Sequence, residues 1–243
     1  MGRFQSNIPA LYLPSGGEAN DRIALPEEES RHVRALRLRA GDPVLLLDGA
    51  GGRTDATVER MERGEVIVRV RARVLDVGEG RPYIALGIGL LADKSRLEWT
   101  IEKGVELGAR EIIPISAERA EGRFQHDRAL RIAVAALKQS QGSFLPTIAD
   151  PTPLARLLER LPEFERACLC HESAPAENSL ARFLISSPGA RRTIVLIGPE
   201  GGFTDREVSA AREASADIVS LGDTRLRSET AAIVALALIG GLG

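Results

Sequence analysis

The chain has 243 residues, of which 44% are hydrophobic and 27% charged, and its formal net charge is −2. This length suits one large domain or two small ones, and the balanced charge excludes a polycation that binds nucleic acid through its overall field. Three scattered histidines and two cysteines form no metal-ligand pattern, and no apolar run is long enough to cross a bilayer. We therefore expect a cytoplasmic protein that has no metal and no membrane partner.

The first 76 residues are predicted to form a small β-rich domain. Strand-like runs of β-branched and aliphatic residues cover 44–48 and 66–74. Around 78–82 the composition changes to glycine, glutamate, arginine and proline, which is typical of a linker. We therefore place a domain boundary there, with a first domain over 1–76 and a second over 82–243.

One helix interrupts these strands and carries several arginines. Pro26 suits its first turn, and the three glutamates that follow favour the positive end of the helix dipole. We expect Val33 and Leu36 to pack inward. The outward side is then shared by arginines three residues apart, namely Arg31, Arg34 and Arg37. The residue pattern alone favours an ordinary solvated face with a Glu27–Arg31 pair over a site for an anionic partner.

From residue 83 onward, strand-like and helix-like segments alternate with short connections. The predicted strands cover 83–91, 111–115, 167–170, 193–198 and 217–221. The predicted helices cover 95–107, 127–139, 154–161 and 229–239, and a further helix starts at Thr204. Alternation of this kind predicts a parallel sheet with helices on both faces.

Sequence patterns also predict how individual helices begin and which side chains they bury. Ser95 with Glu98, and Thr204 with Glu207, have the spacing of capping boxes. In the helix over 127–139 the apolar period predicts three buried side chains, Leu130, Val134 and Leu137.

Two glycine-containing loops follow successive strands near the end of the chain. The first covers 198–202, with sequence GPEGG, and leaves several backbone N–H and C=O groups without side chains over them. The second begins with Leu221–Gly222. Because the carboxyl ends of parallel strands meet at one edge, where α/β proteins bind ligands, we expect both loops to build one site. One such loop alone would be an ordinary turn.

These loops carry a resemblance to a known family. GPEGGFT at 198–204, followed by LG at 221–222 and LRSETA at 226–231, resembles the RsmE-type ribosomal RNA uridine-N3 methyltransferases of the SPOUT superfamily. The segments 30–44 and 90–120 are similar to two further stretches of that family. The resemblance implies an α/β fold: a SPOUT-type parallel sheet with a C-terminal trefoil knot, preceded by a small PUA-like β-barrel that binds RNA. It also implies a homodimer, which the apolar helix at 231–242 would suit.

The implied activity is methylation of N3 of a uridine in 16S (small-subunit) ribosomal RNA by S-adenosylmethionine. The implied cofactor-binding residues are His171, Ile197, Gly198, Pro199, Glu200, Gly201, Gly202, Leu221, Gly222, Leu226 and Thr230. N3 of uridine carries a proton at neutral pH, so the reaction needs a proton acceptor or stabilisation of the developing anion. Glu200, Arg225 and Arg227 are the catalytic candidates, although Arg227 and Glu229 would equally suit a structural role at the last helix. For His171 a structural hydrogen bond is favoured over a role as base.

One position departs from the family pattern. The family usually has a basic residue in the loop after the helix at 126–140, where this chain has Gly142. The RNA contact expected there is either missing or supplied by Lys138. The implied RNA-binding residues are Arg3, Arg31, Arg34, Arg37, Lys94 and Lys138.

Two other functions stay open at this point. One is a SPOUT methyltransferase that acts on another RNA, such as tRNA. The other is an idle RNA-binding or ribosome-assembly protein, which Gly142 favours and the intact glycine loops oppose. A Rossmann dehydrogenase is excluded, because no G-x-G-x-x-G follows an early strand.

Overall fold

The computed structural model describes residues 8–62, 64–75, 81–186 and 189–242. The chain forms two compact units. The first combines Met1–Glu79 with Val134–Leu145, and the second combines Gly80–Ala133 with Pro146–Gly243. The predicted linker at 78–82 begins on residues outside the described ranges. The predicted domain ranges stay predictions, and segment 134–145 groups with the first unit rather than with the rest of 82–243.

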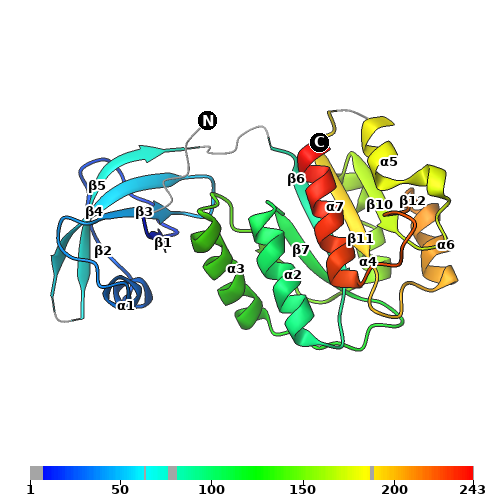
Figure 1. Cartoon of the computed structure of the whole chain (residues 1–243), viewed down its shortest axis with the longest axis horizontal. Coiled ribbons are helices and arrows are strands. Elements are labelled where there is room, and N and C mark those ends of the chain that lie inside the picture. Colours follow the sequence, from blue (N-terminus) through cyan, green and yellow to red (C-terminus); the bar gives the residue numbers. More distant parts are fainter. Residues whose placement is uncertain (1–7, 63, 76–80, 187–188, 243) are drawn as a thin grey trace. The chain divides into compact units, whose positions relative to one another are not determined.

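The first unit contains a five-stranded sheet in the order β1-β3-β4-β5-β2 (Figure 1). Its strands are β1 (Ala10–Tyr12), β2 (Arg22–Ala24), β3 (Pro43–Leu47), β4 (Arg53–Met61) and β5 (Val66–Val74). β1 pairs with β3 in parallel, and the other pairs are antiparallel. In β5, buried Val66, Val68 and Val70 alternate with partly exposed residues. This period of two places one face of the strand on an aliphatic core that includes Leu46 and Val58.

Helix α1 (Glu27–Ala35) ends earlier than its sequence suggested. Val33 is fully buried, as predicted, whereas Leu36 caps the helix end and is 44% exposed. Arg37 has φ +57°, in the left-handed region. The inward position predicted for Leu36 is therefore wrong. The arginine row along the helix ends at Arg34, because the chain leaves the helix before its periodicity reaches Arg37.

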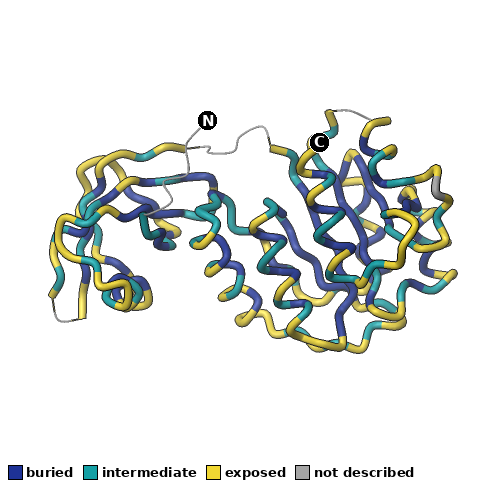
Figure 2. The backbone as a smooth tube through the Cα atoms, viewed as in Figure 1, coloured by how far each residue is buried: buried dark blue, intermediate teal, exposed yellow. Residues whose placement is uncertain are grey.

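The second unit is built on a seven-stranded sheet in the order β12-β10-β11-β6-β7-β8, with β9 also paired to β7 (Figure 1). Its strands are β6 (Tyr83–Gly89), β7 (Glu111–Ser116), β8 (Thr147–Ile148), β9 (Thr152–Pro153), β10 (Arg166–Cys170), β11 (Arg192–Ile197) and β12 (Asp217–Val219). Every pairing in this sheet is parallel. The central strands are almost entirely buried (Figure 2), which is why they appear in the sequence as continuous apolar runs.

Helices cover both faces of this sheet, as predicted. They are α2 (Lys94–Glu106), α3 (His126–Ser140), α4 (Leu154–Leu158), α5 (Leu180–Ser186), α6 (Asp205–Glu213) and α7 (Ser228–Leu242), with short 3₁₀ turns at Leu161–Glu163 and Ala176–Asn178. On one face, α4 and α6 pack on a cluster that includes Ile113 and Leu196. On the other face α7 packs on β6 and β11 and also contacts α2. A Cβ on Gly104 of α2 would lie 3.1 Å from Ile112 and 3.8 Å from Leu236, so glycine permits this close approach.

The helix starts and buried faces were predicted with mixed success. The capping box at Thr204 and Glu207 is present. At α2 the predicted box is wrong: Asp93 is the N-cap, and its carboxylate accepts hydrogen bonds from the N–H and the hydroxyl of Ser95. An aspartate two residues upstream is a better cap than the serine, because its charge also suits the helix dipole.

Helix α3 buries smaller side chains than predicted. Leu137 is buried, but Leu130 is 40% exposed and Val134 is only partly buried. The buried positions are instead Ala129, Ala133, Ala136 and Leu137. These follow the same helical period one residue out of phase, so the periodicity was right and the choice of face by side-chain size was wrong.

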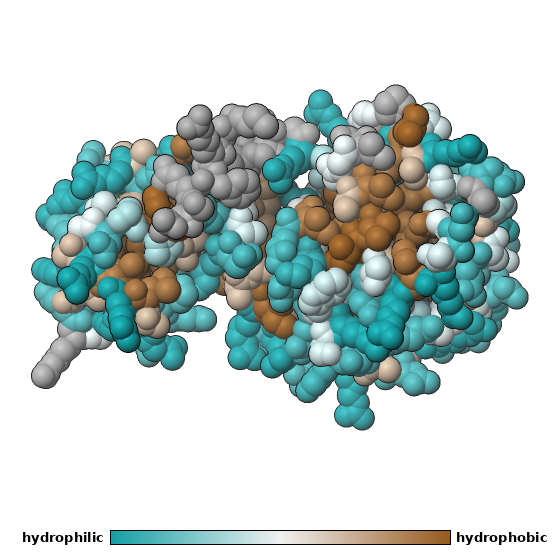
Figure 3. Space-filling view, in the orientation of Figure 1, coloured by the Kyte–Doolittle hydropathy of each residue, from teal (hydrophilic) through white to brown (hydrophobic). Residues whose placement is uncertain are grey.

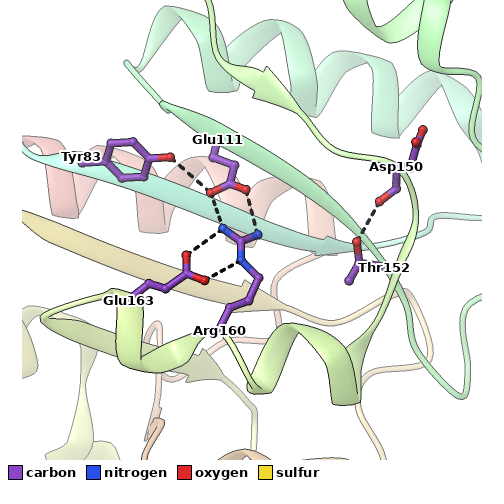
Figure 4. A network of polar contacts seen from close by, with 6 residues as sticks. All are labelled: Tyr83, Glu111, Asp150, Thr152, Arg160 and Glu163. Atoms are coloured by element: carbon purple, nitrogen blue, oxygen red, sulfur yellow. Dashed lines mark hydrogen bonds and ion pairs between the residues drawn. The ribbon is translucent and has the colours of Figure 1, made fainter.

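A polar cluster closes the amino end of the sheet. It consists of Tyr83, Glu111, Arg160, Glu163 and Arg192, and we term it the amino-edge cluster. Figure 4 shows the first four of these residues. The Arg160 guanidinium donates to both oxygens of Glu111, at 2.9 and 3.2 Å, and also to Glu163. These hydrogen bonds raise the pKa of Arg160 above its ordinary value. Tyr83 donates to Glu111 at 3.2 Å, and the Arg192 guanidinium lies 4.1 Å from the Tyr83 ring centroid.

Candidate active site

A cleft of about 680 Å³ lies at the opposite, carboxyl ends of β10, β11 and β12. We term it the carboxyl-edge cleft. Three strand-end segments line it, 170–172, 197–203 and 220–228, together with Arg96, Arg119, Asp205 and Ala231. The two glycine loops predicted from the sequence therefore come together. Every residue predicted to bind the cofactor or to act in catalysis lines this cleft, except Thr230, which is exposed on α7.

Glycines give the 197–203 loop its path. A Cβ on Gly89, at the end of β6, would lie 2.3 Å from the backbone nitrogen of Pro199, so only glycine lets the loop cross the neighbouring strand. Gly202 has φ +70°, and nothing lies within 4 Å of a Cβ built on it. Its N–H donates to the carbonyl of Pro199 at 2.9 Å, which closes the turn at the edge of the cleft.

A segment that follows β7 supports this loop from the side. Arg119 donates to the carbonyl of Gly201 at 2.8 Å, and the N–H of Glu118 donates to Glu207 at 2.8 Å. The Glu118 carboxylate also pairs with Arg206 at 3.3 Å. Because Glu207 completes the capping box, these contacts hold both the loop and the start of α6. Sequence reasoning missed Arg119, since it lies 82 residues from its partner.

Glu200 has an exposed position at the tip of the first loop. Its two carboxylate oxygens accept from the N–H of Ala92 at 3.2 and 3.3 Å. One backbone donor satisfies only part of the hydrogen-bonding capacity of a carboxylate. Glu200 is thus oriented by the protein and can still accept a proton or a further hydrogen bond.

The second loop brings two arginines to the rim of the cleft. Arg225 lies 3.3 Å from Glu172, with 73% and 65% of the two side chains exposed. Such a surface ion pair is weak and opens readily. The Arg227 side chain is exposed and makes no hydrogen bond or ion pair with any residue that the structure describes. Both guanidiniums can therefore turn toward an anion in the cleft.

A further charged pair lies at the start of α7. Arg96 of α2 approaches Glu229 at 3.7 Å, and the Glu229 side chain is only 12% exposed. The second oxygen of Glu229 is buried without a hydrogen-bond partner. The pairing with Arg96 supports a structural role for Glu229. It ties the start of α7, directly after Arg227, to α2. Arg96, which lines the cleft, was not predicted from the sequence.

The third segment supplies His171 and Cys170. The N–H of Ser173 donates to Nδ1 of His171 at 3.2 Å, so that nitrogen acts as an acceptor, and the Ser173 hydroxyl lies 2.7 Å from it. These local bonds agree with the structural role favoured for His171. Burial raises the pKa of Cys170 to about 12, and it raises the pKa of Cys168 well above its ordinary value. Neither thiol is a thiolate nucleophile near neutral pH.

The residues predicted to bind RNA are distributed over both units. Arg3 lies outside the described residues. Arg31 is exposed on α1, Arg34 donates to the carbonyl of Glu62 at 3.1 Å, and Arg37 follows the helix end. Lys94 begins α2.

Lys138 has a different environment from the one expected of an RNA contact. Its ammonium group donates to Glu29 at 2.8 Å within the first unit, and only 15% and 5% of the two side chains are exposed. A cation held this way neutralises a buried carboxylate. The suggestion that Lys138 replaces the missing basic residue at Gly142 is therefore not favoured by its surroundings.

No cluster of His, Cys, Asp and Glu that could hold a metal ion occurs among the described residues. Within the same ranges, no helix combines the length and apolar character needed to cross a bilayer.

Two sequence profiles match the chain. One, described as the RNA methyltransferase domain, covers residues 80–240, and the other, the RNA methyltransferase PUA domain, covers residues 25–71. A cleft framed by glycine loops at the carboxyl edge of a parallel sheet, in a chain with an N-terminal PUA domain, is thus the arrangement of an RNA methyltransferase.

Individual relatives narrow this class. Ribosomal RNA small subunit methyltransferase E of Bacillus subtilis is 29% identical over 89% of each chain. The Synechocystis protein of the same name is 32% identical over 86% of this chain and 69% of its own. A crystal structure of ribosomal RNA small subunit methyltransferase E from Neisseria gonorrhoeae, bound to S-adenosyl methionine, matches with a TM-score of 0.88 and 26% identity over 97% of this chain and 98% of that one. The chain belongs to the ribosomal RNA small subunit methyltransferase E family. The family resemblance is confirmed, and so is the expected α/β fold with a parallel sheet and an N-terminal PUA-like domain, whereas the trefoil knot stays a prediction.

Proposed function

We propose that this protein transfers a methyl group from S-adenosylmethionine to N3 of a uridine in small-subunit ribosomal RNA, in the cytoplasm. The observation that carries the proposal is the carboxyl-edge cleft. There the GPEGG loop and the loop at 221–228 converge on a space lined by backbone groups and bordered by arginines. The uridine and its N3 atom come from the family resemblance and from the fit of these side chains to the chemistry.

The cleft fits the cofactor in size and in lining. Gly202 and Gly222 have φ +70° and +130°, and nothing lies within 4 Å of a Cβ built on either, so the cradle is open. Those backbone N–H and C=O groups of 198–202 and 221–222 that the loops leave unpaired would recognise the adenine, and Ile197 and Leu226 would form its apolar walls. When bound, S-adenosylmethionine supplies an electrophilic methyl group. The protein then has to bind the cofactor and the uridine, orient them for methyl transfer, and accept the proton that N3 loses.

The proton on N3 sets what the side chains must do. As N3 loses its proton, negative charge develops on the ring nitrogen and the neighbouring carbonyl oxygens. Arg225 and Arg227 would stabilise that charge through charge-assisted hydrogen bonds. Glu200 would accept the proton directly or through water, because Ala92 orients its carboxylate and leaves further acceptor sites open.

The target must be presented as a single-stranded base. N3 lies on the Watson–Crick edge, so methylation requires that the uridine be unpaired or turned out of its helix. A separate RNA-binding domain would hold the surrounding RNA, and the exposed Arg31 and Arg37 with the partly buried Arg34 suit contacts to phosphates.

We include a homodimer and the trefoil knot in this proposal. Helix α7 keeps aliphatic side chains on its outward side as well as its inward one, since Ile233, Val234 and Leu238 are only partly buried. Figure 3 shows hydrophobic surface gathered over this part of the second unit. An outward apolar helix face supports burial against a second copy. The knot rests on the family resemblance alone.

The test is a methyl-transfer assay with labelled S-adenosylmethionine. The substrates are small ribosomal subunits that lack the modification, with bulk tRNA in parallel, and mass spectrometry identifies the modified nucleoside. We expect N3-methyluridine in the small-subunit ribosomal RNA. Label in tRNA would identify tRNA as the substrate instead. Absence of label from both RNAs, with the cofactor still bound, would overturn the enzymatic proposal.

A further inference from the structure

A second cavity lies in the second unit beside the carboxyl-edge cleft. Its volume is about 350 Å³, and it is enclosed by α2, the segment 121–125 and the first turn of α3. We term it the α2–α3 cavity. Its lining shares no residue with the lining of the cleft. No role assigned so far uses it, apart from the RNA contact expected of Lys94.

One side of this cavity is apolar and includes an aromatic ring. Leu97 and Ile101 of α2 and Ala129 of α3 are buried beneath it, and Phe124 is partly buried at its wall. The Phe124 ring is packed edge-on against His126, with ring centroids 6.1 Å apart and planes at 89°. A positioned aromatic ring beside an aliphatic floor is a stacking surface that any nucleobase can use.

The other side of the cavity is charged, and its charges are not equally available. Arg128 makes a two-pronged ion pair with Glu98, one bond of which is 2.7 Å long, so these two charges satisfy each other. Lys94 and Arg123 are exposed and make no hydrogen bond or ion pair with any residue that the structure describes. Glu121 also lines the cavity and is exposed, and Lys94 lies close enough to Glu98 to help lower the pKa of that carboxyl. Two cations at the mouth of an aromatic cavity, neither of them in a described salt bridge, suit a phosphate.

The cavity and the cleft are joined through short structural links. Ala92 lines the cavity, and its N–H is bonded to Glu200, which lines the cleft. Arg119, which donates to the carbonyl of Gly201, lies just before the segment 121–125 that supplies Phe124. A molecule in the cavity therefore lies directly behind the loop that frames the cleft.

We propose that the α2–α3 cavity holds an unpaired nucleotide of the RNA substrate next to the target uridine. Its base lies against Phe124 and the aliphatic floor, and its phosphate lies between Lys94 and Arg123. This rests on the proposed function. The occupant is the neighbour and not the target, because the backbone of Ala92 and the side chain of Glu200 stand between the cavity and the cleft.

The first experiment measures methyl transfer to unmodified small ribosomal subunits at saturating cofactor. The cavity variants are Phe124→Ala, which removes the stacking ring, Lys94→Gln, which removes a phosphate contact, and Ala129→Leu, which fills the floor. We expect each to raise KM for the subunit roughly tenfold, with the dissociation constant for S-adenosylmethionine unchanged. Leu130→Ala and Arg131→Gln are matched controls, because they alter exposed residues of α3 outside the cavity lining, and they should leave KM unchanged.

Unchanged KM in Phe124→Ala and Lys94→Gln, in an active enzyme, would overturn the inference while the proposed function stands. A cavity variant that changes self-association instead would also overturn it. Because Ala129→Leu can disturb folding, the surface variants carry the test.

A second measurement does not depend on turnover. Single-stranded RNA that contains 4-thiouridine is crosslinked to the wild-type protein, and the modified peptides are identified by mass spectrometry. Crosslinks in the segment 121–125 support the inference. Crosslinks confined to 197–203 and 221–228, or none, contradict it, whatever the methyl-transfer assay shows.

Discussion

At the amino end of the parallel sheet, Glu111 has 9% of its side chain exposed and is bonded to both Tyr83 and Arg160. At the carboxyl end, Arg225 and Glu172 form a pair whose side chains are 73% and 65% exposed, and the Arg227 guanidinium pairs with no described residue. The same residue types thus do different work at the two ends. Charges that are mutually satisfied and shielded from water stabilise the fold, and charges left loosely paired in water are available to a ligand.

The largest effect on stability should come from the amino-edge cluster. Glu111→Ala leaves the Arg160 guanidinium and the Tyr83 hydroxyl without their main acceptor in a largely dry site. Because Arg160 is itself 33% exposed and keeps Glu163 as a partner, we expect the free energy of unfolding to fall by about 2–3 kcal/mol, the range for leaving buried hydrogen-bonding groups unsatisfied. Denaturant unfolding followed by circular dichroism measures this. Glu163→Ala is the control, because that side chain is 50% exposed. An equal loss of unfolding free energy in Glu163→Ala would show that burial of the partner does not determine the effect.

Substitutions at the carboxyl edge should lower the catalytic activity without lowering the stability of the fold. Arg227→Ala removes a cation that is proposed to stabilise developing charge, so we expect kcat for methyl transfer to fall about 100- to 1000-fold. The free energy of unfolding should stay within about 0.5 kcal/mol of the wild-type value. Arg212→Ala, on the exposed side of α6, serves as a charge-matched control. A folded Arg227→Ala enzyme of normal kcat would assign that arginine to another role.

A smaller effect on stability is expected from the capping box of α6, which lies next to the cleft. Thr204→Ala removes the hydroxyl that accepts from the N–H of Glu207 and opens the capping box of α6. We expect a loss of about 1 kcal/mol in unfolding free energy. Because α6 begins directly after the GPEGG loop, weaker cofactor binding in calorimetry should accompany it. Thr152→Ala tests a hydroxyl of β9, outside the lining of the cleft, which donates to the carbonyl of Asp150 (Figure 4), and it should leave cofactor affinity unchanged.

The smallest effect should come from the exposed pair itself. Glu172→Gln removes the charge opposite Arg225 at the rim, and we expect less than about 1 kcal/mol of change in stability. The released arginine should bind an anion slightly better, so KM for the RNA should fall or stay the same. A large rise in KM would show that Glu172 contacts the substrate and does not merely neutralise Arg225.

The sequence predicted the parts of the site that depend on neighbouring residues. The loop at 198–202 and the Thr204 cap are local, because glycine conformation and capping involve residues within a few positions. Their meeting with the loop at 221–228 followed from the rule for parallel strands, and the family resemblance identified the chemistry.

What the sequence could not supply depends on distant partners. Arg119 and Gly201 are 82 positions apart, and the pairing of Arg96 with Glu229 joins two separate helices. Lys138 appeared as a free cation in the sequence, yet Glu29, 109 positions away, neutralises it. The face of α3 was misjudged for a related reason, since close packing can select small alanines over the larger Leu130.

The grouping of Val134–Leu145 with the first unit has a consequence for dissecting this protein. A fragment that ends near residue 76 would lose Lys138 and leave the carboxylate of Glu29 in an apolar setting without its counter-ion. It would also lose the hydrogen bonds that Ser143 and Leu145 make with Gly51 and Gly49. The first unit is therefore not a portable N-terminal module, and a faithful minimal version must carry that later stretch of chain with it.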